Sequence, residues 1–163
     1  MRTYNVITAI SMGALVSSCA LFYVKPIAYD AYLKGDYETP AVKTEMVGDF
    51  VLSSKGSFTL NVTHIDGAMH KPTVAHLHCG KEGVPGPAVY TLVSDPGVVG
   101  NVYSYSSSIN DRKFTPNPKT ESCPIVIDSI DKLEEAISKG YIYVNVHTKA
   151  HPGGEIRGQL AKE

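Results

Sequence analysis

The amino-acid sequence predicts an all-β protein, an antiparallel, Greek-key-like β-sandwich with one short helix near the C-terminus. Three observations support this prediction. Hydrophobic and polar residues alternate with a period of two in several segments, as they do in strands that bury one face. Tyrosine and β-branched residues, which favour strands, are common. The 163 residues also include 14 glycines and 10 prolines, which supply the many turns between short strands.

The N-terminal residues differ in composition from the rest of the chain. Residues 6–24 lack charged side chains, which is typical of a cleaved signal peptide or a retained membrane anchor. Cys19 ends a Val-Ser-Ser-Cys sequence that fits the bacterial lipobox, so lipidation at Cys19 is a third alternative. All three alternatives place the domain outside the cytosol, either secreted or attached to a membrane. We divide the chain into a signal peptide or anchor (1–30), a linker or leading edge (31–46) and a β-sandwich domain (47–163).

The first clear alternation predicts a hairpin. Residues 47–53 and 57–65 have the pattern of strands, and the glycine-containing segment 54–56 between them is typical of a hairpin turn. Further strands are expected at residues 73–79, 88–93 and 97–108.

The strand at 73–79 carries two histidines on one face. Leu77 and Cys79 share its apolar face with Ala75, and His76 and His78 share the opposite face. The glycine- and proline-rich residues that follow, 80–87, cannot form regular structure and are expected to be a loop.

A short helix is expected after a long loop at residues 110–124. Asp131, followed three residues later by Glu134, resembles a capping box. Gly140 is a natural end for the helix, which presents a narrow apolar stripe containing Leu133 and Ile137.

The C-terminal segment, residues 141–160, is predicted to form strand, tight turn and strand. Residues 141–147 alternate strictly, with Ile142, Val144 and Val146 toward the core. We expect the opposite face to be exposed; it consists of Tyr141, Tyr143, Asn145 and His147. The turn contains Pro152-Gly153-Gly154.

Two cysteines follow the N-terminal segment. Cys79 and Cys123 most simply form one disulfide in an exported chain, closing a loop of about 44 residues. The alternative is that Cys79, next to His78, is a metal ligand, although zinc sites usually contain closely spaced cysteine pairs. Asn61 lies in an Asn-Val-Thr glycosylation sequon, which has meaning in a eukaryotic source.

Composition and motifs exclude several functions. The formal net charge of −1 leaves no basic surface of the kind that binds nucleic acid, so no nucleic-acid partner is expected. Residues 80–87 lack the Gly-Lys-Ser/Thr ending of a phosphate-binding loop. No recognisable nucleophile motif is present, and no catalytic residue is predicted.

Two blocks of sequence, AHLHCGKEGVPGPAVYTL (75–92) and YIYVNVHTKAHPGGEIRGQL (141–160), carry a family resemblance. They resemble the CHRD domain, named after chordin, in its His-x-His…Gly…Gly-Pro and Tyr-x-Asn-x-His-Thr…Gly-Glu-x-Arg-Gly motifs. The resemblance implies an extracellular β-sandwich without established enzymatic activity, which serves structural or binding roles toward an extracellular protein or glycan. Chordin's antagonism of growth factors is not implied, since the chain has one copy of the domain. The motif positions beyond the histidines are Gly80, Gly86, Pro87, Asn145, Thr148, Gly154, Glu155, Arg157 and Gly158.

A weaker resemblance concerns the histidines. The order of His76-x-His78, His147 and Arg157 is similar to that of the copper ligands and the arginine of copper-zinc superoxide dismutases, which are also β-sandwiches. His-x-His in a strand places both imidazoles on one face, about 7 Å apart at Cα, which suits two ligands of one metal. We therefore expect His76, His78, His147 and His151 as candidate ligands for copper or zinc. The alternative is that they are structural and hydrogen-bond to backbone and loops.

Two smaller expectations concern other polar residues. Glu155 and Arg157 are expected to form a surface ion pair, or Arg157 guards an anion path to the metal. His64 and His70, beside a turn, are expected to be exposed.

The resulting functional prediction is an exported, non-catalytic CHRD-like module for binding or structure at the cell surface or in the extracellular matrix. The first alternative is a copper- or zinc-binding protein similar to superoxide dismutase. The second is a subunit of an envelope or membrane assembly, anchored by residues 6–24.

Overall fold

The computed structural model of the chain describes residues 28–94, 97 and 100–163. The signal peptide or anchor expected at 1–30 lies outside the described residues up to residue 27, and so does Cys19. Within the described part of the chain, no helix is both long and apolar enough to cross a membrane.

The described residues form nine strands, one α-helix and three short 3-10 helices. The strands are β1 (Ala28–Lys34), β2 (Val47–Ser53), β3 (Ser57–Thr63), β4 (Pro72–Cys79), β5 (Ala88–Ser94), β6 (Val102–Ser108), β7 (Ile142–Thr148), β8 (Ile156–Gln159) and β9 (Ala161–Lys162). The helices are α1 (Ile130–Ser138), η1 (Gly35–Tyr37), η2 (Ala68–His70) and η3 (Asp111–Lys113).

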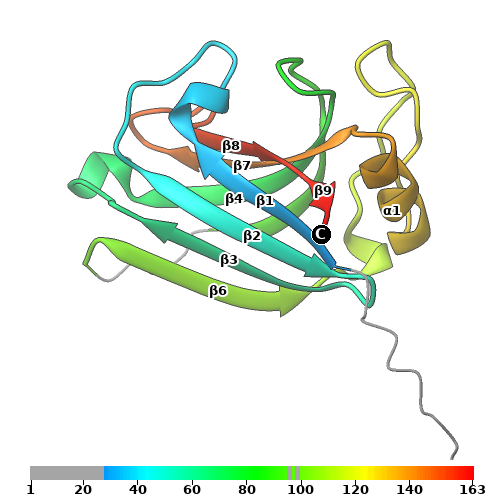
Figure 1. Cartoon of the computed structure of the whole chain (residues 1–163), viewed down its shortest axis with the longest axis horizontal. Helices are drawn as coiled ribbons and strands as arrows, with labels where there is room; N and C mark the ends of the chain where they lie inside the picture. Colours follow the sequence, from blue (N-terminus) through cyan, green and yellow to red (C-terminus); the bar gives the residue numbers. More distant parts are fainter. Residues whose placement is uncertain (1–27, 95–96, 98–99) are drawn as a thin grey trace, which may run out of the picture.

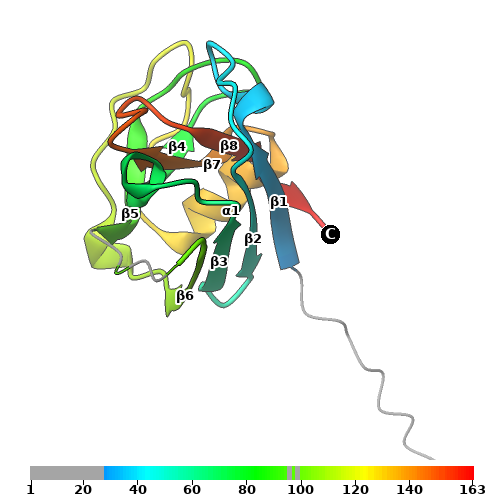
Figure 2. The same ribbon diagram turned by 90° about the vertical axis from the view of Figure 1, so that its left-hand side faces the viewer.

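The strands form one continuous antiparallel sheet. Their order is β5-β4-β7-β8-β1-β2-β3-β6, with the short β9 beside β1. The sheet is strongly curled, so that its two halves face each other like the layers of a sandwich (Figure 1, Figure 2). Its two end strands, β5 and β6, approach closely enough to line one cavity of about 620 Å³. The all-β antiparallel prediction is confirmed, and both layers belong to a single sheet.

β1 differs from the expected organisation. It pairs with β2 over seven residues and contacts β8 through Lys34 and Arg157, so it lies inside the sheet. Burial alternates along it, and Leu33 is fully buried. The segment predicted as a linker at 31–46 therefore begins with the end of a core strand. Prolines and charges after residue 35 masked the short period-two pattern before them.

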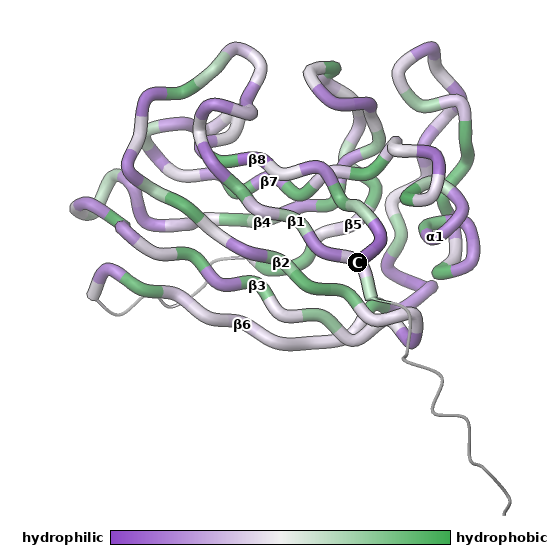
Figure 3. Tube along the Cα trace, viewed as in Figure 1, coloured by the Kyte–Doolittle hydropathy of each residue, from purple (hydrophilic) through white to green (hydrophobic). Residues whose placement is uncertain are grey.

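The predicted hairpin is present at β2 and β3. Val47 pairs with Thr63 and Leu52 with Phe58, and Gly56 adopts a positive φ of 83° in the turn between the strands. Hydrophobic and hydrophilic residues alternate along both strands (Figure 3). β6 is shorter than predicted, beginning at Val102, and its serines and tyrosines give it intermediate hydropathy (Figure 3).

The core lies between the two halves of the curled sheet. It is formed by the alternating apolar side chains of successive strands, and Leu33, Phe50, Leu60, Leu77 and Val144 are each fully buried. Burying a side chain of this size contributes about 1.5–3 kcal/mol relative to leaving it exposed.

β7 is buried on both faces, in contrast to the prediction that one face is exposed. Tyr143, Asn145 and His147 are 4%, 3% and 9% exposed. Three loops cover this outer face: Glu38 in the β1–β2 connection contacts Asn145, Gly86 in the β4–β5 loop contacts Tyr143, and Pro152 in the β7–β8 turn contacts His147. The outer face of β7 is thus a buried polar layer.

The helix α1 packs its stripe of Leu133, Ala136 and Ile137 against the core, as predicted. Gly140 follows it with a φ of 71°, which ends the helix. Its start differs from the prediction, because the N-cap is Ser129, whose hydroxyl accepts a hydrogen bond of 3.3 Å from the Lys132 amide.

We expect Ser129→Ala to lower the free energy of unfolding by about 1 kcal/mol, because the Lys132 amide loses its capping acceptor. Urea unfolding followed by circular dichroism measures this change. Asp131→Ala is the matched control, since Asp131 is not the cap, and it is expected to cost less. A larger loss in the control would contradict the assignment of the cap.

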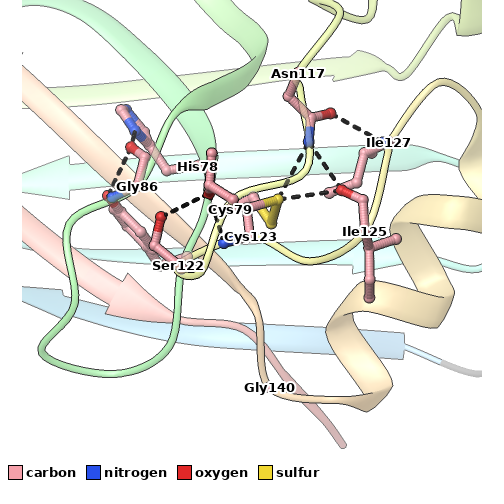
Figure 4. Close-up of a disulfide and its surroundings, with 12 residues drawn as sticks. His78, Cys79, Gly86, Asn117, Ser122, Cys123, Ile125, Ile127 and Gly140 are labelled. Carbon is pink, nitrogen blue, oxygen red and sulfur yellow. Dashed lines mark hydrogen bonds between the residues drawn. A yellow bond between two sulfur atoms is a disulfide. The ribbon is translucent and has the colours of Figure 1, made fainter.

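The expected disulfide is present. Cys79, at the end of β4, is bonded to Cys123 in the long loop after β6, and both are fully buried (Figure 4). Asn117, which is 4% exposed, donates to Ile125 O at 2.8 Å and accepts from the Ile127 amide at 2.9 Å. The bridge attaches the loop to the core at the end of β4 that carries the histidines, and Asn117 joins two parts of the same loop.

Candidate metal site

Three of the four candidate histidines converge on the outer face of the sheet. His76 and His78 come from β4 and His147 from the adjacent β7. Each offers one ring nitrogen, and these three atoms lie within 4.8 Å of one another. The centroid of the His147 ring lies 4.9 Å from the centroid of the His76 ring and 5.9 Å from that of the His78 ring. We call these three residues the histidine triad.

Hydrogen bonds to backbone carbonyls fix two of the three imidazoles. His78 Nδ1 lies 3.0 Å from Gly86 O, and His147 Nδ1 lies 2.9 Å from Pro152 O. A carbonyl only accepts, so both Nδ1 atoms carry the proton and both Nε2 atoms keep their lone pairs in the neutral rings. His76 Nδ1 lies 3.0 Å from His147 Nε2 and, in this state, donates to it.

The remaining nitrogen of His78 has no partner. His78 Nε2 is buried and makes no hydrogen bond, although buried polar atoms are nearly always satisfied. Carbonyl-bound Nδ1 with a free Nε2 is also the arrangement that metal-ligating histidines adopt. The triad residues therefore fit a metal ion.

Burial favours the neutral imidazoles. It lowers the pKa of His78 from 6.5 to about 4, against the opposing hydrogen bond to Gly86. Burial and the neighbouring His147 lower the pKa of His76, and burial lowers the pKa of His147. Near pH 7 the triad is uncharged, which is the state that binds metals.

The β4–β5 loop explains the Gly-Pro motif. A Cβ atom on Gly86 would overlap with the Cys79 carbonyl group, so only glycine permits this approach. Cys79 N donates to Pro87 O at 2.9 Å, which folds the loop back on β4. This fold places Gly86 O where His78 Nδ1 can reach it (Figure 4). A Cβ on Gly80 would lie 2.6 Å from Val84 O, so this position is also tight.

His151 does not join the triad. It lies with His70 and Glu155 in a second group, whose ligand atoms also fall within 4.8 Å of one another. The prediction of His151 as a fourth ligand is therefore not supported by its position, because the β7–β8 turn carries it toward η2. His64 is exposed as expected, whereas the His70 side chain is 35% exposed and lies 2.7 Å from Glu155 Oε1.

Glu155 and Arg157 do not form a surface ion pair, because they are 0% and 3% exposed. The Glu155 carboxylate accepts hydrogen bonds from Thr44 and Thr148 at 2.7 and 2.6 Å. The predicted surface pair is wrong since loops cover both residues.

Arg157 supports the β4–β5 loop. It donates to Lys81 O at 2.8 Å and to Val84 O at 3.2 Å. Its guanidinium lies 3.4 Å from the centre of the Tyr143 ring, and His78 stacks on the same ring at 5.0 Å. β4 and β8 flank β7 on opposite sides, so Tyr143 lies between Arg157 and His78. This position does not suit an arginine that guards a path to the triad.

The other motif residues hold the polar layer together. Asn145 donates to Glu38, and a Cβ atom on Gly154, which has a φ of 132°, would overlap with both. A Cβ atom on Gly158 would lie 2.5 Å from Tyr32 O, so this glycine lets β1 approach β8.

The sequon residue Asn61 lies in the middle of β3. Its side-chain amide donates to Asp49 at 2.8 Å and accepts from Ser104 at 2.6 Å. Both the nitrogen and the oxygen of the side-chain amide are thus hydrogen-bonded to side chains of the neighbouring strands, β2 and β6.

Sequence reasoning missed Glu38, Thr44 and His70 as parts of the polar layer. Glu38 and Thr44 lie in the segment that was expected to be a linker, and His70 was expected to be exposed. These residues reach the polar layer because β1 pairs with the C-terminal strands, and a single sequence does not reveal this pairing.

Comparison with known proteins identifies one family. The model of the CHRD domain family matches residues 29–160. No curated protein and no solved structure matches the chain. The match begins at β1, which agrees with the position of β1 inside the sheet.

Proposed function

The chain belongs to the CHRD domain family, and from this membership we propose that it is an exported binding domain. From the geometry of the site we further propose that the triad, His76, His78 and His147, holds one copper or zinc ion. The observation that carries the proposal is the convergence of ligand nitrogens from the three histidines within 4.8 Å of one another, together with the buried, unpartnered Nε2 of His78.

The donor set favours copper or zinc over other common cations. Three imidazoles are ligands of borderline softness, which suit copper and zinc, whereas calcium and magnesium prefer oxygen. Three protein ligands leave a further position open for water or another small ligand. A bound ion would supply a Lewis-acidic centre there.

The chain's own residues prepare this site before any ion binds. Gly86 O and Pro152 O orient His78 and His147, and Tyr143 stacks on His78 from the side. His76 Nδ1 donates to His147 Nε2 in the free site, so this hydrogen bond has to break before His147 Nε2 can bind an ion. We propose binding rather than turnover, since Arg157 lies on the far side of Tyr143.

Export is part of the proposal. The buried disulfide between Cys79 and Cys123 is of the kind that persists in oxidising compartments outside the cytosol. The uncharged run at residues 6–24 supports a signal peptide or an anchor, and hence a secreted or membrane-attached domain.

A second candidate function is the binding of an extracellular glycan or protein without metal. A cavity of about 380 Å³ favours it, because Tyr32 and Tyr37, which are 56% and 42% exposed, line this cavity beside Glu38 and Arg157. Exposed tyrosines combine an apolar ring with a hydrogen-bonding hydroxyl and are common at recognition sites. Loss of binding to a glycan array on Tyr37→Ala would favour this candidate.

The test of the metal proposal is metal content by plasma mass spectrometry on the full chain, purified without a histidine tag. We expect the full chain, incubated with copper and then desalted, to retain one more equivalent of copper than His78→Ala does. His64→Ala is the matched control, because His64 is exposed and outside both histidine groups. Copper retention that is equal in His78→Ala and His64→Ala would refute the triad as the binding site.

A further inference from the structure

We propose that His70, His151 and Glu155 form a second cation site, separate from the triad and suited to zinc. The three residues share none with the triad, and their ligand atoms lie within 4.8 Å of one another. Two imidazoles and one carboxylate are a zinc donor set that leaves one position open.

The carboxylate is the most strongly constrained member. Glu155 is fully buried, and both of its oxygens are held, Oε1 by Thr44 and Oε2 by Thr148. A buried carboxylate requires compensation by hydrogen bonds and by positive charge. His70, with Nδ1 2.7 Å from Oε1, is positioned to share either a proton or a metal ion with it.

Backbone hydrogen bonds bring the two histidines to this carboxylate. Ala150 N donates to Met69 O at 2.9 Å, which joins the β7–β8 turn to η2 and places His70 beside the turn. Gly154 N donates to His151 O at 3.0 Å, and His151 N donates to Thr148 Oγ1 at 3.1 Å. The resulting ring centroids of His70 and His151 are 5.9 Å apart.

A simple ion pair between protonated His70 and Glu155 would use only two of the three residues. His151 has no part in that pair, and its ring is half-buried beside His70. A zinc ion instead uses all three and explains why the turn directs His151 to this point. Both histidines are partly exposed, so an ion can enter from solvent.

His151 is also the residue whose replacement disturbs the fold least. The contacts that shape the turn come from its backbone N and O atoms, which alanine retains. Glu155→Ala would leave Thr44 and Thr148 without their acceptor and is unsuitable as a first test.

The experiment is zinc titration by calorimetry on the full chain in the His76→Ala/His78→Ala background, in which the triad cannot bind. We expect one equivalent of zinc, lost when His151→Ala is added and retained when His64→Ala is added instead. No zinc binding in the background, or unchanged binding with His151→Ala, overturns the proposal.

A second comparison tests the proposal if the His76→Ala/His78→Ala variant does not fold. In the otherwise unaltered chain, His151→Ala is expected to remove one of the zinc equivalents bound, and an unchanged stoichiometry overturns the second site. The proposed function fails independently, because its test is copper retention in His78→Ala, in which His70, His151 and Glu155 are intact.

Discussion

Replacing both Cys79 and Cys123 by alanine is expected to lower the free energy of unfolding by about 4 kcal/mol, the loop-closure entropy of a 44-residue loop. The bridge joins the end of β4 to a loop without regular structure between η3 and α1. Without it, the unfolded chain gains the conformational freedom that the cross-link removes. Urea unfolding under oxidising conditions measures the change.

Reduction supplies the control for this prediction. Dithiothreitol should destabilise the wild-type chain by a similar amount and leave the double-alanine variant unaffected, since the variant has no bridge to reduce. A wild-type stability that does not change on complete reduction, or a variant loss below about 1 kcal/mol, would contradict the entropic account.

Acidification from pH 7 to pH 4 is expected to destabilise the metal-free protein by about 3 kcal/mol through His78 alone, at 1.36 kcal/mol per pKa unit. Its pKa falls from 6.5 to about 4 on folding because the ring is buried. The folded chain therefore binds fewer protons than the unfolded chain between these values. The contribution of His78 to the free energy of unfolding is fully present above about pH 6.5 and is lost as the pH falls toward 4. His76 and His147, whose pKa values are also lowered, act in the same direction.

Urea unfolding at several pH values, in the presence of a chelator, measures this dependence. His78→Gln is the matched variant, because it removes the titrating ring, and its stability should fall less over the same interval. Glu38 opposes the trend, since burial raises its pKa and the folded chain takes up a proton there more readily. A wild-type stability that is flat between pH 7 and pH 4 would show that the imidazoles are not buried as the structure has them.

Alternation in the sequence predicted most strands correctly because each of them buries one face. It identified the inward residues of β7, but it could not show that loops cover the outward residues Tyr143, Asn145 and His147. Coverage depends on contacts between residues distant in sequence, such as Glu38 with Asn145. Period-two patterns carry no information about such contacts.

The candidate site was also predictable only in part from the sequence. His-x-His on one strand face predicted the pairing of His76 and His78, and the end of the neighbouring strand supplied His147. His151 was misassigned because its direction depends on the β7–β8 turn, where Ala150 N bonds to Met69 O. The geometry of this turn and its contact with η2 cannot be inferred from residue spacing in the sequence alone.

The position of β7 and β8 in the sheet has a consequence for the order of folding during synthesis. They join β4 and β5 on one side to β1, β2, β3 and β6 on the other, although they follow all of these strands in the sequence. A ribosome delivers the earlier strands first, so the two halves of the sheet cannot be joined by hydrogen bonds until residues 142–159 have emerged. The nascent chain therefore remains incompletely folded until its last strands appear.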